Sequence, residues 1–186
     1  MKTKQLALTG LMAAVLCILG PISLPIPISP VPISLGTFAV FLTVYILGMK
    51  LGTISVCIYI LLGLVGVPVF SGFSGGVGKV LGPTGGYIIG FLFMALIIGF
   101  FVDKWKTNFV LIAIGMILGT AVCYLFGTVW LAKQAGMSFS AALAAGVIPF
   151  IPADIVKMIL AVLIGHQVKV RLWKASILEK ERKKYL

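Results

Sequence analysis

The chain alternates between long apolar runs and short segments that are polar or rich in proline and glycine. Six of the runs are long enough, or nearly long enough, to cross a bilayer, which takes about 20 apolar residues per helix. The first three runs are shorter than the rest, and the proline-rich segment after the first run could complete a span. We expect transmembrane helices over residues 6–20, 35–49, 53–67, 85–102, 108–132 and 152–171.

Composition places these runs in a membrane. Of the 186 residues, 61% are hydrophobic and only 10% are charged, and the mean hydropathy is +1.20. A soluble domain is roughly half apolar, so residues 1–186 are expected to form a single membrane domain, an all-α bundle of six transmembrane helices. The formal net charge of +11 does not indicate nucleic-acid binding, because the basic residues lie between apolar runs and at the C-terminus. Contact with the lipid bilayer explains them better.

The positions of Lys and Arg predict the orientation of the spans, because positive residues concentrate in short cytoplasmic segments. If both termini are cytoplasmic, twelve of the fifteen basic residues fall on the inner side. The outer segments then hold only Lys79 and Lys133, and the remaining residue, Lys157, lies within the last span. We therefore expect both termini in the cytoplasm and a basic C-terminal tail that contacts anionic lipid.

Sequence signals of catalysis are missing. The chain has no Ser-His-Asp set, no HExxH pair and no paired carboxylates within the apolar runs. The stretch SGGVGKVLG is similar to part of a phosphate-binding loop, but Val80 follows Lys79 where that loop needs Ser or Thr. Three cysteines are scattered over three spans and His166 lies near the inner end of the last one, so no metal or cofactor is expected. The protein is not predicted to be an enzyme.

Two outer loops have unusual compositions. Residues 20–34 hold five prolines among apolar residues and no charge, which predicts a stiff, nonhelical segment. This proline loop is interpreted either as a lid or as a re-entrant connector packed against the helices. The second loop, residues 67–87, is rich in glycine, which permits a close approach to a ligand but serves close packing equally well.

Three helix N-termini are expected to meet at the outer face, because the second, fourth and sixth helices all begin there. Thr84, followed by two glycines, is a favourable N-cap, and Pro152 suits the first turn of a helix. If the last helix begins at Pro152, Asp154 lies in its first turn. If it begins near Gly146 instead, Asp154 and Lys157 lie deeper in the membrane.

Asp154 and Lys157 are two opposite charges in an otherwise apolar span. Each charge costs roughly 2.5 to 3.5 kcal/mol at the bilayer centre, so neither side chain is expected to face lipid. At i and i+3 they share a helix face and can pair. A purely structural salt bridge is one interpretation, but buried ion pairs seldom offset their own desolvation, which favours a role in ligand binding.

The stretches VGVPVFSGFSGGVGKVLGPTGGYIIGF, PADIVKMILA and PVPISLGTFAV together resemble BioY, the family of biotin-binding S components of energy-coupling factor (ECF) vitamin transporters. The resemblance covers nearly the whole chain. It implies a six-helix protein that captures biotin from outside, while a transmembrane T subunit and two cytoplasmic ATPases drive its reorientation and the release of biotin inward. One departure is Gly36, where the family often has Gln, so any role of that amide is absent or taken over by another group.

The resemblance implies a role for each candidate residue. Asp154 would accept hydrogen bonds from the ureido N–H groups, and Lys157 would donate to the ureido carbonyl or hold Asp154 in place. Tyr87 and Phe70 would wall the ring, and Lys79 with the outer helix ends would meet the carboxylate. In the opposite arrangement, Lys157 meets the carboxylate. The remaining expected contacts are Gly82, Thr84 and Gly86.

The first apolar run carries small residues four apart, which permit close helix approach in lipid. Such motifs on the first helix resemble the family's surface for the T subunit, and the candidate docking residues are Gly10, Ala13 and Ala14. Two other functions stay open. One is a membrane scaffold whose charge pair is only structural. The other is a self-sufficient secondary transporter of another small anion, which the lack of evident inverted repeats weakens.

Overall fold

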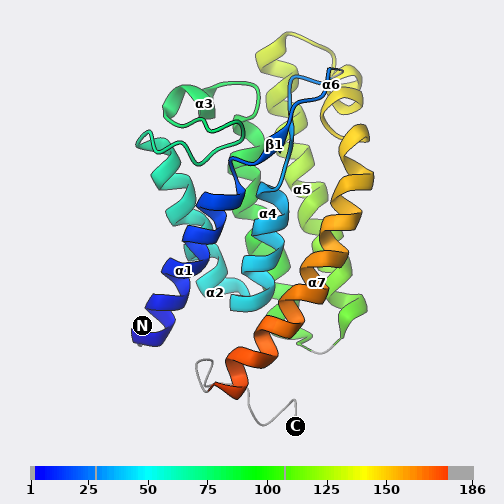
Figure 1. The fold of residues 1–186 in the computed structure, drawn as a ribbon. Helices are drawn as coiled ribbons and strands as arrows, with labels where there is room; N and C mark the ends of the chain where they lie inside the picture. Colours follow the sequence, from blue (N-terminus) through cyan, green and yellow to red (C-terminus); the bar gives the residue numbers. More distant parts are fainter. Residues whose placement is uncertain (1–2, 28, 107, 176–186) are drawn as a thin grey trace.

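The computed structural model describes residues 3–27, 29–106 and 108–175, and its long helices run roughly along one axis (Figure 1). By length and composition, four helical segments of this described part could cross a membrane, namely α2, α4, α5 and residues 139–174, whereas α1 is a shorter apolar helix. In chain order the elements are α1 (Thr3–Leu19), β1 (Ser23–Leu24), β2 (Ile33–Ser34), α2 (Gly36–Leu64), α3 (Val77–Leu81), α4 (Gly85–Lys104), α5 (Phe109–Ala135), α6 (Phe139–Gly146), the 3-10 helix η1 (Ile148–Phe150) and α7 (Ile151–Lys174).

Helix α2 contains both the second and the third predicted spans, because the chain reverses direction within it (Figure 1). Gly48 makes this turn with φ 76° and ψ −172°, a backbone conformation that is essentially restricted to glycine. The Asp103 carboxylate accepts a hydrogen bond from the Met49 backbone N–H at 3.1 Å, so it caps the second half of α2 from the end of α4. Counting both halves of α2, the six predicted segments are all present as helices.

The observed helix ends agree with the predicted ones to within about one turn, and the start of α7 decides between the two predicted alternatives. Val147 (φ −129°, ψ −56°) breaks the helical path after α6, and α7 begins at Ile151, so Asp154 lies in its first turn. The short α3, α6 and η1 and the two-residue strands were not predicted. Apart from those strands, the all-α class is confirmed.

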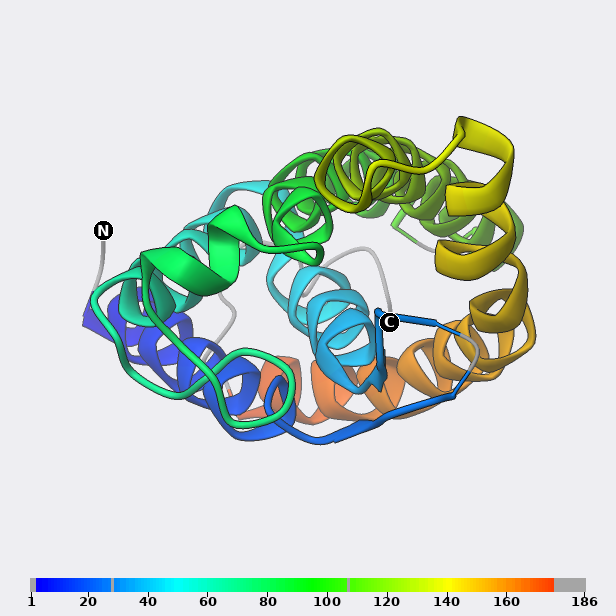
Figure 2. The same ribbon diagram turned by 90° about the horizontal axis from the view of Figure 1, so that it is seen from above.

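The first half of α2 forms the centre of the bundle. Seen from above, the other long helices surround it (Figure 2). Residues 39–48 are buried without interruption, which is the pattern of a helix that is apolar on all sides and has no face toward the surroundings. Phe41 and Val44 are fully buried there. The N-terminal residues of this central helix lie beside the first turn of α7, where Thr37 contacts Asp154.

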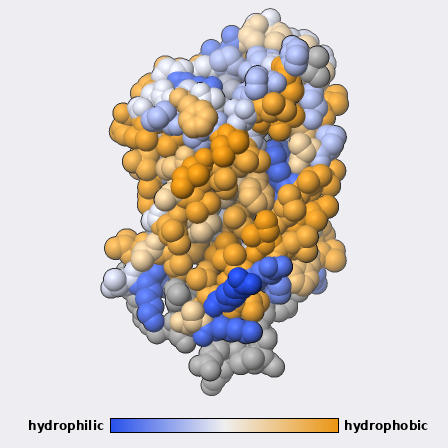
Figure 3. Space-filling view, viewed as in Figure 1, coloured by the Kyte–Doolittle hydropathy of each residue, from blue (hydrophilic) through white to orange (hydrophobic). Residues whose placement is uncertain are grey.

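The face of the bundle seen in Figure 3 has a hydrophobic belt between more hydrophilic ends. At one end, Lys104 Nζ lies 4.7 Å from the ring centroid of Trp105, and Lys169 Nζ lies 5.5 Å from that of Trp173. Trp and Lys with these contacts are typical of a membrane–water interface. Helix α1 begins and α7 ends at this same end (Figure 1).

The proline loop and the glycine-rich loop lie together at the opposite end. The proline loop is pinned at its base, because β1 and β2 pair antiparallel and Ser34 Oγ donates to the Gly20 carbonyl at 3.0 Å. The Gly72 N–H donates to the Pro21 carbonyl at 3.0 Å and joins the two loops. The described residues of this loop, 20–27 and 29–34, are not helical, as predicted.

Candidate functional site

A cavity of about 70 Å³ lies between the helices next to the proline loop and the glycine-rich loop. One water needs about 10–15 Å³ measured in this way, so the cavity has room for several. Its walls come from α2, α4, α5 and α7 and from both loops, including Val31 and Pro32 of the proline loop. Most of the lining is aromatic or aliphatic, and the charged groups gather where α2, α5 and α7 approach one another.

Asp154 and Lys157 form the charged part of this cavity. Their side chains are paired at 2.8 Å and are almost fully buried, with 3% and 7% of each residue exposed. The predicted pairing at i and i+3 is therefore confirmed. Because both charges are removed from water, they are stable only while each is satisfied by hydrogen bonds.

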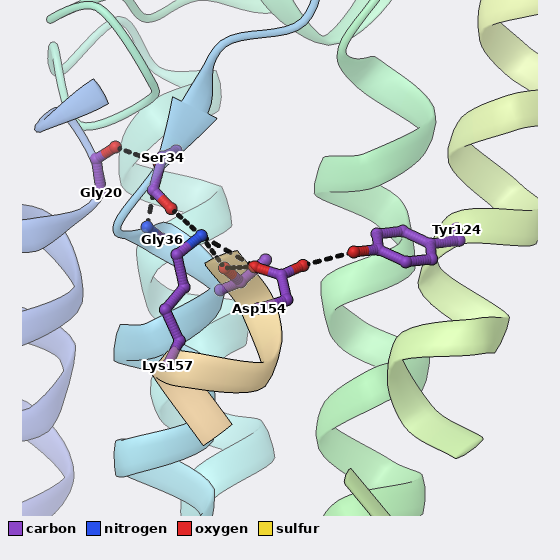
Figure 4. Close-up of polar contacts among 7 residues, drawn as sticks. Gly20, Ser34, Gly36, Tyr124, Asp154 and Lys157 are labelled. Carbon is purple, nitrogen blue, oxygen red and sulfur yellow. Dashed lines mark hydrogen bonds and ion pairs between the residues drawn. The ribbon is translucent and has the colours of Figure 1, made fainter. Parts of the chain in front are cut away.

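Lys157 uses all three of its N–H donors within the protein (Figure 4). Its Nζ donates to Asp154 Oδ1 at 2.8 Å, to the Ser34 carbonyl at 2.7 Å and to Thr37 Oγ1 at 3.0 Å. Ser34 is the last residue of the proline loop and Thr37 lies in the first turn of α2. Lys157 therefore links α7 to the base of the proline loop.

Asp154 accepts hydrogen bonds from three side chains. Lys157 and Thr37 donate to Oδ1, the latter at 3.1 Å, and Tyr124 Oη donates to Oδ2 at 2.6 Å. Figure 4 shows Tyr124 reaching from α5 toward Asp154 on α7. Three donors, one of them a cation, point at this carboxylate, so Asp154 serves as an acceptor.

Sequence analysis missed Thr37 and Tyr124. Each is a polar residue in an apolar span, and the sequence does not show which face of its helix meets α7. The one available signal for Thr37 is its place next to Gly36, where the resembled family often carries Gln. In the structure, Thr37 Oγ1 donates to Asp154 and accepts from Lys157.

Three other predicted residues also line the cavity. Tyr87 is buried, and its Oη donates to the Gly146 carbonyl at 2.9 Å, which ties α4 to the segment before α7. Phe70 packs edge-on against Tyr59 with ring centroids 5.5 Å apart. Thr84 precedes α4 as predicted, yet its side chain does not cap the helix, and its buried Oγ1 has no hydrogen-bond partner in the described structure.

Lys79, Gly82 and Gly86 do not line this cavity. Lys79 lies on α3 and is half-buried, and desolvation lowers the pKa of its ammonium group. The Gly82 carbonyl accepts a hydrogen bond from Trp130 Nε1 at 2.9 Å. A Cβ at Gly86 would overlap the Trp130 side chain, so in this structure Gly86 permits the close packing of α4 on α5.

The three candidate docking residues on α1 do not share one environment. Gly10 and Ala14 are exposed on the outside of the bundle, and nothing lies within 4 Å of a Cβ built at Gly10. Ala13 is only 3% exposed and belongs to the protein's own interior. The docking hypothesis is therefore narrowed to Gly10 and Ala14.

An apolar helical bundle that encloses a hydrogen-bonded charge pair next to two loops is a multi-pass membrane protein with the features of a small-molecule site. The hydrogen-bonding groups around Asp154 and Lys157 suit a polar organic ligand. Within the described ranges, no group of three or more His, Cys, Asp and Glu side chains could hold a metal ion.

Comparison with known proteins identifies the particular family. The sequence model of the BioY family matches residues 1–174, so the chain belongs to the BioY family. A probable biotin transporter BioY from Pyrococcus horikoshii is 42% identical over 169 residues, covering 91% of this chain and 98% of the relative. The biotin transporter BioY of Thermotoga maritima is 37% identical over 166 residues, covering 89% and 96%.

A solved structure agrees with this assignment. The crystal structure of the S-component for biotin from an ECF-type ABC transporter is 37% identical and superposes with a TM-score of 0.84. The match covers 90% of this chain and 92% of that one. The similarity of fold therefore extends over most of the chain.

Proposed function

We propose that this member of the BioY family is a high-affinity biotin-binding S component, a transport protein rather than an enzyme. It captures biotin from outside the cell and releases it inward when coupled to an ATP-driven module. The observation that carries the proposal is the Asp154–Lys157 pair, buried in a cavity with aromatic walls and surrounded by further hydrogen-bonding groups. Burying a charge pair in a membrane helix costs desolvation free energy, and a role in binding a polar ring explains why the pair is present.

The ligand is oriented with its ureido ring at the charge pair. Asp154 accepts an N–H of the ureido group, and Lys157, which already has three protein acceptors, holds Asp154 in place. Tyr87 and Phe70 contact the apolar thiophane ring. This arrangement is supported by the complete use of the Lys157 donors, since the opposite one would require Lys157 to give up a partner for the carboxylate.

The carboxylate end of the ligand lies toward the start of α4. Thr84 Oγ1 is buried there without a partner, and the N-terminus of a 20-residue helix favours negative charge. Lys79 lies on α3, which immediately precedes this helix, and reaches the carboxylate from outside the cavity lining. Gly82 and Gly86 shape the backbone at this point rather than contacting the ligand.

The bundle is oriented with both termini in the cytoplasm. This orientation is supported by the predicted inner location of twelve of the fifteen basic residues and by the Lys–Trp contacts at the end where α1 begins. The proline loop then faces outside, where biotin arrives. A transmembrane T subunit docks on α1 through Gly10 and Ala14, and two cytoplasmic ATPases supply the energy.

Binding of radiolabelled biotin to the purified chain tests the proposal. Retention at nanomolar biotin, displaced by unlabelled biotin, is the expected result. No retention at micromolar biotin by folded protein would reject the proposal and favour a scaffold. Uptake that persists without the ATPases but stops when the proton gradient is collapsed would favour a self-sufficient transporter.

A further inference from the structure

The donors around Asp154 leave few acceptor positions for a ligand. A carboxylate offers about four lone-pair positions, two on each oxygen. Lys157 at 2.8 Å and Thr37 at 3.1 Å use both positions of Oδ1, whereas Tyr124 at 2.6 Å uses one position of Oδ2 (Figure 4). While this network is intact, a single position on Oδ2 stays open.

Tyr124 also separates the cavity from the membrane. Thr120, Tyr124 and Asp154 line both the cavity and a groove between α5 and α7 whose other lining residues are all apolar. Ile117 and Ile155, on opposite sides of this groove, are more than half exposed. The hydrogen bond from Tyr124 to Asp154 therefore joins two residues that line both spaces, and it holds Oδ2 from the side of α5.

We propose that Tyr124 and Thr37 are positioning residues that leave Asp154 one acceptor site, so that the cavity reads one N–H of the ureido ring rather than both. This inference rests on the proposed binding of biotin. The two N–H bonds of a five-membered cyclic urea point away from each other, so one carboxylate oxygen accepts only one of them. By holding Oδ2, Tyr124 sets which nitrogen of the ligand that is.

The experiment compares biotin with its two mono-N-methyl ureido derivatives, each of which lacks one N–H. Wild-type protein should bind one derivative within about threefold of biotin and the other at least about tenfold more weakly, because a hydrogen bond to a charged group is lost and the methyl collides. In Tyr124→Phe, which keeps the ring, the ratio between the two derivatives should fall at least fivefold, since Oδ2 is no longer fixed.

Tyr45→Phe is the matched control, because Tyr45 is a buried phenol on α2 outside the cavity lining. It should keep the wild-type ratio. Thr37 provides a second test if Tyr124→Phe does not fold: Thr37→Val opens a position on Oδ1 and should also lower the ratio, whereas Thr37→Ser keeps the hydroxyl and should preserve it. Thermal unfolding in the same detergent separates these effects from loss of structure.

Each result bears on one of the two proposals. If wild-type protein binds biotin and both derivatives equally well, or loses both derivatives equally, the single N–H contact is wrong while biotin binding stands. If the wild-type ratio is large and both Tyr124→Phe and Thr37→Val retain it, the positioning role is wrong. If folded wild-type protein does not bind biotin, the proposed function and this inference fail together.

Discussion

At the scale of single residues, the charge pair is held by groups from four separate segments. Asp154 and Lys157 come from α7, Thr37 from α2, Tyr124 from α5 and the Ser34 carbonyl from the proline loop. Every hydrogen of the Lys157 ammonium has an acceptor, so removing any acceptor leaves part of a buried cation unsatisfied. The network is therefore sensitive to single substitutions at Asp154 and at Lys157.

Removing one charge of the pair should abolish high-affinity binding. Asp154→Asn leaves Lys157 buried beside a weaker neutral acceptor, and Lys157→Ala leaves Asp154 without its cation. Breaking a buried pair costs roughly 3 to 5 kcal/mol, which is on the order of a thousandfold in affinity if the bound state bears all of it. Equilibrium binding of radiolabelled biotin measures the change, and thermal unfolding shows how much of it reflects stability.

The double variant Asp154→Asn with Lys157→Met separates a ligand-binding pair from a structural one. Both charges are removed together, so no buried charge is left without its partner and the protein should fold about as well as wild type. It should nevertheless fail to bind biotin. Wild-type affinity in this double variant would mean that the pair only holds the helices together.

Biotinol, which carries an alcohol in place of the carboxylate, tests the direction of the ligand. With Lys157 at the ureido end, wild type and Lys157→Ala should prefer biotin over biotinol by similar ratios. Lys79→Ala should erase the preference, because Lys79 is the cation next to the start of α4. Competition binding gives the ratios, and erasure by Lys157→Ala instead would place the carboxylate at the charge pair.

At the scale of elements, the sequence predicted helices better than it predicted the contacts between them. The spans were found because bilayer thickness and apolar composition constrain their length, and Pro152 indicated one of the two predicted starts of α7. The turn at Gly48 was not predicted. The partners of Asp154 depend on how the helices are rotated about their axes. Tyr124 is 30 positions away from Asp154 and Thr37 is 117 positions away, and no periodicity brings them together.

The turn within α2 predicts a stability effect at Gly48. An added Cβ at φ 76° is strained and would meet the Asp103 carboxylate, so Gly48→Ala should destabilise the protein by about 1 to 3 kcal/mol. Gly10→Ala is a matched control, because Gly10 is helical with open space around it and Ala favours the helix by about 1 kcal/mol. Thermal unfolding should show a lower midpoint for the first variant only.

The position of the proline loop predicts that bound biotin protects the loop from chemical labelling. Val31 and Pro32 line the cavity and the base of the loop is pinned, so closure of the tip over biotin should shield it. In a background without the native cysteines, Ser29→Cys should react more slowly with a thiol reagent when biotin is bound. Val65→Cys, at an exposed site directly after α2, should react equally in both states. Equal labelling of Ser29→Cys with and without biotin would count against a lid.

At the scale of the whole molecule, the proposed ligand site and the proposed docking face lie on separate parts of the bundle. The cavity is lined by α2, α4, α5 and α7, and no residue of α1 contributes to it. Helix α1 packs on the rest of the bundle through Leu8, Met12 and Leu16, which are buried, and turns Gly10 and Ala14 outward. A subunit that must move relative to its partner without losing its ligand benefits from such a separation, because the docking face can change contacts while the cavity stays intact.

This separation predicts that docking and binding respond to different substitutions. Gly10→Leu combined with Ala14→Leu adds bulk to the outward face of α1 and should prevent co-purification with a T subunit and its ATPases, while biotin affinity changes by less than about twofold. Ala141→Leu with Ala144→Leu adds the same bulk to exposed positions of α6 and should leave assembly intact. Affinity capture of the complex and biotin binding, measured on the same preparations, give the two readouts. Loss of both assembly and biotin binding in the α1 variant would mean that this face of α1 packs inside the protein's own core.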